Sequence, residues 1–292
     1  MISSFSKSNP IFIGGMYKSG TSLLRAMLGQ HSNIAGGLET FWFDLDVADK
    51  NQIKQSTINW DATRKEPLEQ HISRLADFFD FDKDFVFSII KICTSPEEFI
   101  DRFMSEYAAL KGKKRWLEKT PANILHIERI FAFWPNAYFI HVVRDPRDVY
   151  SSNALKSEEL SKPEFFARLW IKFISAYEEA KKNCFPRSMI EIRYEDLVLD
   201  PAKTMRRVLD FVHEPWEIKV AGFYGEPQDL AKVRKITGIT SSTLMRLSRP
   251  LATDRIGAWK KELFDAKCLQ ELEWIIQNAG FSEIWNAYKY SK

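Results

Sequence analysis

The stretch that most constrains the fold is a strand, a glycine-bounded turn and a helix within residues 10–31. Residues 10–15, PIFIGG, are mostly apolar and predict a short buried strand. After a polar turn, residues 21–31 place apolar side chains at the spacing of a buried helix face, namely Leu23, Leu24, Met27 and Leu28. A strand that runs through a tight turn into a helix is typical of α/β proteins with a parallel sheet.

The rest of the chain repeats this alternation. Residues 137–143 form a nearly continuous apolar run, which is expected of a strand covered on both faces in a parallel sheet. Further strands are predicted within 115–123 and 189–197, and helices at about 123–134, 146–156, 163–183, 200–213 and 266–278. We therefore expect an α/β protein with three layers, in which helices flank a central parallel sheet.

One long stretch, residues 46–110, departs from the alternation and is predicted to be mostly helical. Within it, Ser95, Pro96 and Glu98 have the spacing of a capping box at the start of a helix. The glycine pair at 36–37 breaks any helical period in residues 33–45, so that segment is predicted as a short strand or loop. Because no linker-like stretch divides the sequence, we expect one domain over residues 1–292 with an insertion at about 46–110.

Composition and charge exclude several classes of protein. The formal net charge of +3 is too small to predict a nucleic-acid-binding surface, although it is compatible with a small anionic ligand. The apolar runs are strand-sized, so no membrane span is expected, and the short polar start predicts no signal peptide. The three cysteines, Cys93, Cys184 and Cys268, form no CxxC pair and predict a reducing, cytoplasmic location.

The turn after the first strand has the character of a phosphate cradle. Gly15 and Gly20 have the spacing of a Walker A loop, but Thr21 replaces its lysine, and Lys18 lies two residues before Gly20. Backbone N–H groups and hydroxyls suited to an oxyanion are offered by Ser19, Gly20, Thr21 and Ser22. Taken alone, such a turn is equally consistent with a tight strand-to-helix connection.

A second anion site is predicted at the ends of two later strands. Arg144 ends the strand at 137–143, Ser152 lies two turns into the next helix, and Tyr194 ends the fourth strand. Taken alone, Arg144 is better explained by a solvated ion pair with Asp145, and Tyr194 by packing. Since the carboxyl ends of parallel strands meet at one sheet edge, two anion sites there favour a ligand phosphorylated at both ends, such as a nucleoside 3′,5′-bisphosphate.

Together these residues resemble the sulfotransferases that use 3′-phosphoadenosine 5′-phosphosulfate (PAPS). The segment YKSGTSLLRAMLGQH (17–31) resembles the family's loop for the 5′-phosphosulfate, and VVRDPRDVYSS (142–152) its 3′-phosphate motif. The resemblance is closest to the tyrosylprotein sulfotransferases and their bacterial relatives, over roughly 11–45, 115–156 and 188–213. It implies a P-loop-like fold, PAPS as co-substrate and no metal.

The resemblance also implies roles for particular residues. Lys18 would stabilise the leaving oxygen of the donor, and Glu39 would be the base that deprotonates the acceptor during an in-line transfer. Lys119, in EKTP, matches a lysine that touches the transferred group. Lys156 stands where relatives have an arginine near the 3′-phosphate, and Tyr194 matches a cofactor-binding tyrosine.

The sequence departs from the tyrosylprotein enzymes in two places. Ala258 precedes the late tryptophan where they have lysine, so Arg255 and Lys260 are predicted to make the closing contact with the cofactor. Phe41 replaces an arginine that binds acidic peptides in those enzymes, which weakens the prediction of an acidic peptide acceptor.

The sequence leaves more than one acceptor and more than one reaction class open. A hydroxyl or amine of a small molecule, glycan, lipid or peptide fits, and Phe41, Trp42 and Phe43 either line its pocket or belong to the core. His126 and His141 are expected to be packing residues rather than bases. The competing functions are an ATP-dependent P-loop kinase and a non-catalytic nucleotide-binding protein of the same fold. The oligomeric state stays open.

Overall fold

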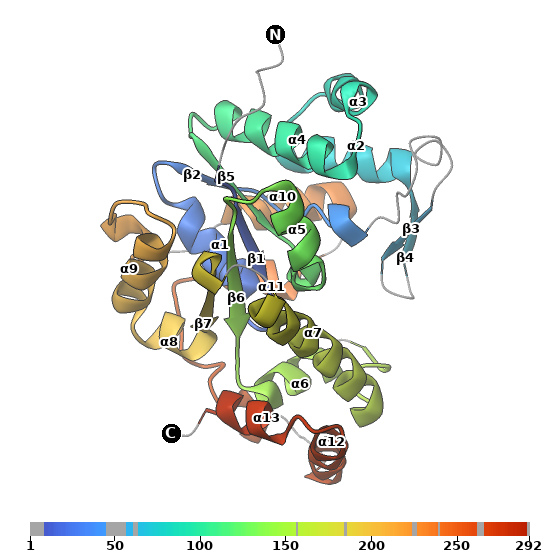
Figure 1. The fold of residues 1–292 in the computed structure, drawn as a ribbon, viewed down its shortest axis with the longest axis vertical. Helices are drawn as coiled ribbons and strands as arrows, with labels where there is room; N and C mark the ends of the chain where they lie inside the picture. The colour runs from blue at the N-terminus through green and yellow to red at the C-terminus, as the bar shows by residue number, and fades with distance from the viewer. Residues whose placement is uncertain are drawn as a thin grey trace.

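The structure is a computed structural model that describes residues 9–44, 57–60, 64–155, 157–183, 186–223, 227–238, 240–261 and 266–290. Figure 1 shows the chain as an elongated body with the strands near its middle. Helices α2, α3 and α4 lie at one end, and the C-terminal helices α12 and α13 lie at the other.

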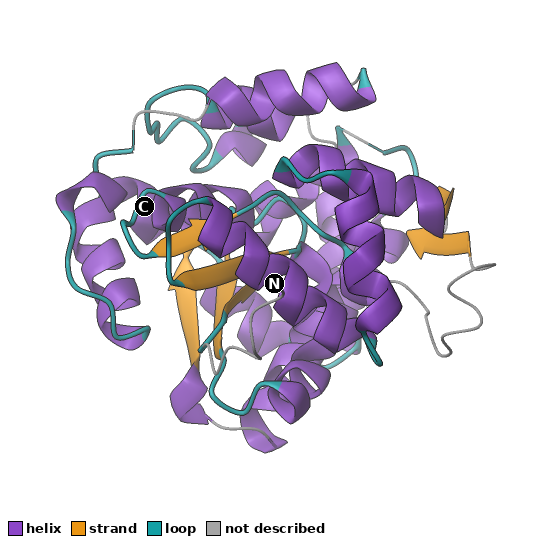
Figure 2. Cartoon of the chain, turned by 90° about the horizontal axis from the view of Figure 1, so that it is seen from above, coloured by secondary structure: helices purple, strands orange, loops and turns teal. Residues whose placement is uncertain are grey.

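A five-stranded parallel sheet forms the centre of the molecule. Its order is β2–β5–β1–β6–β7, with every neighbouring pair parallel. The strands are β1 (Ile11–Gly14), β2 (Ile34–Gly36), β5 (Arg115–Lys119), β6 (Tyr138–Val143) and β7 (Met189–Arg193). Figure 2 shows these strands enclosed by helices, which confirms the predicted three-layer α/β fold.

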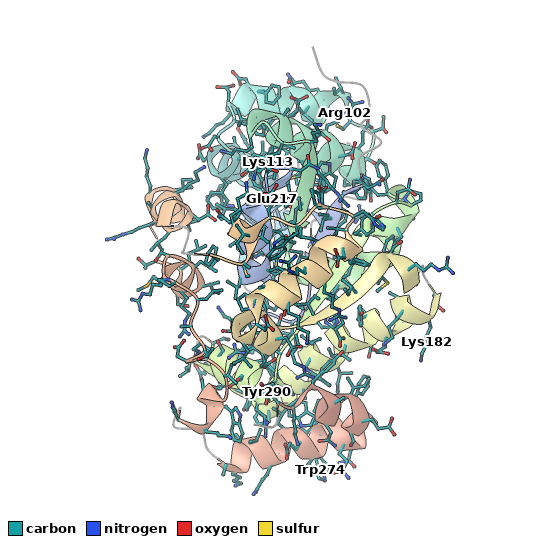
Figure 3. All side chains as sticks on the ribbon, turned by 90° about the vertical axis from the view of Figure 1, so that its left-hand side faces the viewer. Arg102, Lys113, Lys182, Glu217, Trp274 and Tyr290 are labelled. Atoms are coloured by element: carbon teal, nitrogen blue, oxygen red, sulfur yellow. The ribbon has the colours of Figure 1, made fainter. Side chains whose placement is uncertain are left out.

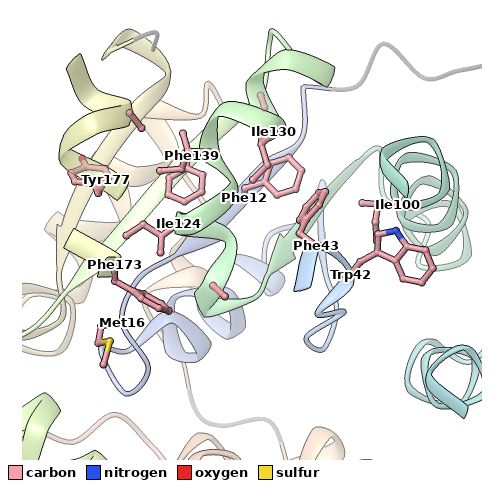
Figure 4. Close-up of a cluster of buried hydrophobic side chains, with 14 of the residues drawn as sticks. Phe12, Met16, Trp42, Phe43, Ile100, Ile124, Ile130, Phe139, Phe173 and Tyr177 are labelled. Carbon is pink, nitrogen blue, oxygen red and sulfur yellow. The ribbon is translucent and has the colours of Figure 1, made fainter. Parts of the chain in front are cut away.

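The two faces of the sheet carry different hydrophobic clusters because side chains alternate along each strand. Phe12, Trp116 and Phe139 point to one face, where Figure 4 shows Phe12 and Phe139 among Ile124, Ile130 and Phe43. The other face carries a second cluster, which includes Ile11, Ile13, Leu117, Ile140, Val142 and Ile192. Burial on both faces explains why β1 and β6 are almost continuously apolar in sequence.

Each face is covered by its own set of helices. The cluster around Phe12 receives side chains from α4 (Pro96–Leu110), α5 (Ile127–Phe133), α7 (Pro163–Asn183) and α12 (Ala266–Asn278). The opposite cluster receives side chains from α1 (Thr21–Gly29), α9 (Pro201–Phe211) and α11 (Ser242–Leu247). Helices α6 (Pro146–Ala154) and α8 (Tyr194–Leu199) begin just beyond the carboxyl ends of β6 and β7.

The stretch predicted as a helical insertion contains α2 (Leu68–Phe79), α3 (Lys83–Ile92) and α4, and also an antiparallel hairpin of β3 (Thr57–Trp60) and β4 (Arg64–Pro67) that the sequence analysis missed. At the start of α4 the Ser95 side chain accepts from the Glu98 N–H, as predicted. The Glu98 carboxylate reaches back to the N–H of Thr94 rather than to that of Ser95.

Some helices differ from the predicted ones. The expected helix at 123–134 starts as a 3₁₀ helix, η2 (Pro121–His126), and becomes α-helical only in α5. Strand β7 ends at Arg193, four residues earlier than predicted, because α8 begins at Tyr194. The irregular region after Pro215 contains α10 (Pro227–Thr237) and α11, and α13 (Ser282–Tyr288) follows α12.

Two of the predictions from composition concern cysteines and membrane helices. Cys93 and Cys268 are free thiols, while Cys184 lies outside the described residues. In the described ranges, we find no helix that combines the length and the apolar character needed to cross a bilayer.

Candidate active site

The turn between β1 and α1 forms an open helix N-terminus. Lys18 and Gly20 both have positive φ, 72° and 107°, and α1 begins at Thr21 directly after them. No side chain caps this helix and its first turn holds no acidic residue. Its first N–H groups and the positive end of its dipole therefore point toward the loop. The Ser19 hydroxyl is buried there and has no hydrogen-bond partner among the described residues.

Tyr194 lies against this turn from the end of β7, two strands away from β1 in the sheet. It is the first residue of α8, and a Cβ added to Gly20 would lie 2.6 Å from its ring carbon Cδ2. The guanidinium carbon of Arg144 lies 4.6 Å from the centre of the same ring. Glycine at position 20 therefore allows the tyrosine to approach the turn, and Arg144 stacks on the tyrosine as a cation–π pair.

Arg144 joins the phosphate-type turn to the late part of the chain. It follows β6 directly, is 6% exposed, and donates to the carbonyl oxygens of Lys18 at 3.1 Å and Arg255 at 2.6 Å. Its Nε is buried and makes no hydrogen bond within the described ranges. One buried cation thus faces the turn with donor capacity left over.

Glu39 and Lys119 form an ion pair next to the start of α1. Lys119 is the last residue of β5 and is 2% exposed, and its ammonium donates to the Glu39 carboxylate and, at 2.9 Å, to the Ser22 hydroxyl. Burial lowers the pKa of Lys119 below its ordinary value of 10.5, whereas the charge of Glu39 acts to raise it. The structure therefore brings the predicted base and the predicted sulfonate-contacting lysine into direct contact.

The late loop is fixed by Asp148, a residue that the sequence analysis did not single out. This carboxylate is fully buried on α6 and accepts from the N–H groups of Gly257 at 2.9 Å and Trp259 at 3.0 Å. It also lies 3.5 Å from the guanidinium of Arg144. Its place in the first turn of the helix that follows Arg144 was the available signal, although it does not reveal the contacts with the late loop.

Lys18 has a partner that no motif predicts. Its ammonium lies 3.4 Å from the hydroxyl of Thr243 on α11, at the far end of an irregular region of the sequence. The same helix contributes Leu244 and Leu247 to the core cluster beside α1. The segment before the late loop therefore packs onto the phosphate-type turn.

Of the predicted site residues that the structure describes, Ser152 and the Lys260 side chain are not joined to this cluster. Ser152 is half-buried on α6, and its hydroxyl makes no hydrogen bond to the part of the chain that the structure describes. Lys260 is exposed, with its ammonium 5.8 Å from the centre of the Trp259 ring. Lys156 lies outside the described residues.

The aromatic residues after Glu39 divide into core and edge. Trp42 and Phe43 are each 4% exposed, and Trp42 stacks on Phe99 with ring centres 4.0 Å apart. Phe43 contacts Trp134 edge-on. Phe41 is only partly buried and packs against the edge of the core cluster around Phe12, so it is the least buried of the three.

The buried histidines are bound to other parts of the fold, as expected of packing residues. His141 on β6 lies 3.3 Å from the carboxylate of Glu191 and packs on Tyr177. His31 lies 2.9 Å from the carbonyl oxygen of Pro215. Within the described ranges, no three His, Cys, Asp or Glu side chains are arranged to hold a metal ion.

The fold and the edge together define a class: a three-layer, P-loop-like α/β protein whose candidate site lies where β1, β5, β6 and β7 end. The family model described as the sulfotransferase family matches residues 10–218, which is most of the chain. The chain therefore belongs to the sulfotransferase family.

Several named proteins are similar in sequence. Protein-tyrosine sulfotransferase A of Caenorhabditis elegans is 25% identical over 226 residues, which cover 74% of this chain and 53% of that protein. The omega-hydroxy-beta-dihydromenaquinone-9 sulfotransferase Stf3 of Mycobacterium tuberculosis is 26% identical over 243 residues, covering 68% of this chain and 61% of that protein. The chain thus spans about half the length of the curated relatives it matches.

Solved structures show the same fold. The sulfotransferase domain from the curacin biosynthetic pathway superposes with a TM-score of 0.62 at 18% identity, covering 94% of this chain and 98% of that domain. The sulfotransferase domain of the Synechococcus PCC 7002 olefin synthase gives a TM-score of 0.57 at 16% identity, with the same coverage.

Proposed function

We propose that this protein transfers a sulfuryl group from PAPS to a hydroxyl or amine of an acceptor. The observation that carries the proposal is the position of Lys119, whose ammonium contacts both Ser22 on the helix after the phosphate-type turn and the carboxylate of Glu39. A cation there lies between a helix N-terminus suited to the donor and a carboxylate suited to the acceptor's proton.

The residues at this edge fit a bisphosphate nucleotide. The first turn of α1, with Ser19, Gly20, Thr21 and Ser22, would hold the 5′ end through N–H groups and hydroxyls. Arg144 and Tyr194 would hold the 3′-phosphate end and the nucleoside. Ser19 Oγ and Arg144 Nε, which are buried and have no hydrogen-bond partner among the described residues, support this fit because buried polar groups normally have partners.

Other residues are assigned to the donor by resemblance alone. Ser152 and Lys156 would contact the 3′-phosphate from α6 and the residues after it. Arg255 and Lys260 would close the late loop over the nucleotide, and the bond from Arg144 to the Arg255 carbonyl supports the placement of that loop.

The donor supplies a sulfuryl group attached to a phosphate leaving group. In the proposed reaction the acceptor oxygen forms a bond to sulfur while the bond from sulfur to the bridging oxygen breaks. Glu39 takes the acceptor's proton, and Lys18 and Lys119 stabilise the negative charge that develops on the leaving phosphate oxygen. The products are the sulfated acceptor and adenosine 3′,5′-bisphosphate.

The acceptor class is proposed only broadly, as a small molecule, glycan, lipid or peptide. The similar proteins named above are sulfotransferases of protein tyrosine and of a hydroxylated menaquinone. Phe41, beside Glu39 and only partly buried, favours an acceptor with apolar or aromatic character. We further propose that the chain acts as a single domain, in the cytoplasm, with acceptor choice set by the region between β2 and β5.

Two measurements test the proposal. Titration calorimetry should detect binding of adenosine 3′,5′-bisphosphate without added metal, and weaker or no binding of ATP with Mg²⁺. Transfer from ³⁵S-labelled PAPS should then be screened against 4-nitrophenol, a tyrosine-containing acidic peptide, a long-chain alcohol and a sulfate-free glycan. Tight ATP binding with no binding of the bisphosphate would favour a kinase. Bisphosphate binding without transfer to any acceptor would favour a non-catalytic nucleotide-binding protein.

A further inference from the structure

Glu118 is a buried carboxylate that precedes Lys119 on β5 and has no role in the proposed chemistry. It is 1% exposed and accepts hydrogen bonds on both oxygens. The hydroxyls of Thr40 and Thr120 each donate to Oε1 at 2.8 Å, the Thr40 N–H donates at 3.3 Å, and the Asn123 amide donates to Oε2. Burial raises the pKa of Glu118, and these four donors act to lower it.

The segment that Glu118 holds is the turn carrying Glu39. Thr40 immediately follows Glu39, and Phe41 adopts a left-handed φ of 52°. A non-glycine residue in that region costs roughly 1–2 kcal/mol and persists only where its surroundings fix it. Here the Phe41 N–H donates to Thr120 Oγ1 at 3.1 Å, and the Trp42 indole N–H donates to the carbonyl of Pro96 at 2.9 Å.

Consecutive residues of β5 therefore fix this turn in two ways. Side chains alternate along a strand, so Glu118 and Lys119 leave it in opposite directions. Glu118 binds the backbone and hydroxyl of Thr40, whereas Lys119 binds the carboxylate of Glu39. The backbone of the turn is fixed by one residue and its functional side chain by the next.

We propose that Glu118 is a positioning residue that holds Glu39 in place to accept the acceptor's proton. This inference rests on the proposed sulfuryl transfer and assigns that site a residue beyond those expected from the family resemblance. Glu118 makes no contact with Lys18, Ser19 or Arg144 within the described ranges, so it should affect deprotonation of the acceptor rather than binding of the nucleotide.

A double-mutant cycle on Glu118 and Glu39 tests the proposal. Glu118→Gln keeps the side chain's shape but faces an NH₂ group toward Asn123 or toward the two threonines. We expect kcat for ³⁵S transfer to fall about 10- to 100-fold, with the Kd for adenosine 3′,5′-bisphosphate changed less than about 2-fold. In a Glu39→Gln background the same change should lower kcat no further, because the effect acts through Glu39. The acceptor is the one from the set above on which the parent is fastest.

Substitutions at Thr40 test the same role if Glu118→Gln does not fold, and they include a conservative variant that should keep activity. Thr40→Ser keeps the hydroxyl that donates to Glu118 and should retain kcat within about 3-fold, whereas the isosteric Thr40→Val should lower it as Glu118→Gln does. Asp101→Asn is the matched control: Asp101 is also a buried carboxyl on α4, it accepts from the Trp134 indole at 2.8 Å, and in the described ranges it makes no hydrogen bond to Glu39, Thr40 or Phe41. It should lower the melting temperature without a change in kcat at a permissive temperature.

Each outcome decides between support and rejection. If the parent transfers sulfate but Glu118→Gln and Thr40→Val keep its kcat, or if the losses at Glu118 and Glu39 multiply, the positioning role is wrong while the proposed function stands. If Asp101→Asn loses kcat to the same extent, the effect is general destabilisation and the positioning role is again wrong. If the parent transfers nothing, the proposed function itself fails, and the role of Glu118 fails with it.

Discussion

The ammonium group of Lys119 donates hydrogen bonds to the carboxylate of Glu39 and to the hydroxyl of Ser22. Lys119 belongs to β5, Glu39 to the loop after β2, and Ser22 to the first turn of α1. These elements are adjacent because β5 lies between β2 and β1 in the sheet. A single buried cation thus connects the predicted base to the predicted donor site. Removing that cation tests whether it serves sulfuryl transfer rather than nucleotide binding.

Replacing Lys119 by methionine should impair transfer far more than nucleotide binding. Methionine has a similar length and no charge, so Lys119→Met removes the cation that would stabilise the leaving oxygen. We expect kcat to fall by about 10²–10³, as for loss of one preorganised donor in other transfer enzymes. Timed assays with ³⁵S-labelled PAPS measure kcat, and calorimetry measures the Kd for adenosine 3′,5′-bisphosphate.

A matched control for this change is Lys181→Met, because Lys181 is an exposed lysine on α7 paired with Glu178. It should leave kcat unchanged, since a surface pair of this kind contributes little. Equal losses in the two variants would contradict a specific role for Lys119.

The burial of Lys119 predicts a pH dependence of the reaction. Burial lowers the pKa of Lys119 below 10.5, so on raising the pH its proton is lost earlier than from an ordinary lysine. Transfer should therefore decline on the alkaline side at a pH below 10.5, as the ammonium becomes neutral. Lys119→Arg should move that decline to higher pH, because a guanidinium stays protonated. A kcat profile from pH 6 to 11 for both proteins is the measurement, and an alkaline decline identical in the two would assign it to another group.

Gly20 should tolerate no side chain. An added Cβ would lie 2.6 Å from the Tyr194 ring, and φ at Gly20 is 107°. We expect Gly20→Ala to lower the free energy of unfolding by about 1–3 kcal/mol and to weaken bisphosphate binding, because the ring and the turn must move apart.

Gly112→Ala separates this clash from the loss of glycine's conformational freedom. Gly112 also has a positive φ of 65°, but no atom lies within 4 Å of the added Cβ. Its variant should cost about 1 kcal/mol and leave the bisphosphate Kd unchanged. Urea unfolding and calorimetry on both variants give the comparison; equal effects on binding would remove the argument from Tyr194.

Glu217 should make stability depend on acid pH. The loop between α1 and β2 is bound by two side chains that are labelled in Figure 3, those of Glu217 and Lys113. Glu217 accepts from the N–H of Ser32, and Lys113 donates to the carbonyl oxygens of Gly29 and Ile34. Burial acts to raise the pKa of Glu217, but the hydrogen bonds from Ser32 and Lys219 and the charge of His31 together lower it from 4.5 to about 2. Between these values the unfolded chain binds more protons, so the stabilisation is complete above pH 4.5 and is lost as the pH falls through about 2.

The corresponding variant is Glu217→Gln, with melting temperature measured from pH 7 down to pH 2.5. The variant should melt below the parent at pH 7, and the difference should shrink as the pH falls. Glu128→Gln, at an exposed position on α5, is the control and should follow the parent throughout. A difference between Glu217→Gln and the parent that does not vary with pH would contradict the carboxylate's role.

The parts of the fold that the sequence predicted best are those dominated by burial and local turn chemistry. The runs in β1 and β6 are apolar because both faces of the sheet are covered, and the caps at Ser95 and Gly20 act within a few residues. Where a helix follows a strand without a break, as at Arg193 and Tyr194, the apolar pattern continues and hides the boundary. The strands of the β3–β4 hairpin are only four residues each, and β4 is charged and ends at Pro67, so neither is long enough to show a clear strand pattern.

The candidate site likewise contains residues that the sequence could place and contacts that it could not. Lys18, Arg144 and Tyr194 could be placed at one edge because parallel strands bring their carboxyl ends together. The contacts of Asp148 with the late loop, and of Thr243 with Lys18, join residues separated by about a third or more of the chain. Nothing local in the sequence specifies such pairs, so they emerged only from the three-dimensional structure.

The late loop should depend on Asp148. This buried carboxylate accepts from two backbone N–H groups of the loop, those of Gly257 and Trp259, and Asp148→Ala would leave both without this partner. We expect the loop to detach, so that trypsin cuts faster after Arg255, Lys260 or Lys261, and the bisphosphate Kd rises about 10-fold. Asp200→Ala is the control, because Asp200 caps α9 through the Lys203 N–H on an exposed surface. That variant should lose stability without faster cleavage at the loop. If added bisphosphate slows cleavage of the loop in the parent but not in Asp148→Ala, the contact between Asp148 and the loop is linked to nucleotide binding. If Asp148→Ala is cleaved no faster than the parent, other contacts hold the loop.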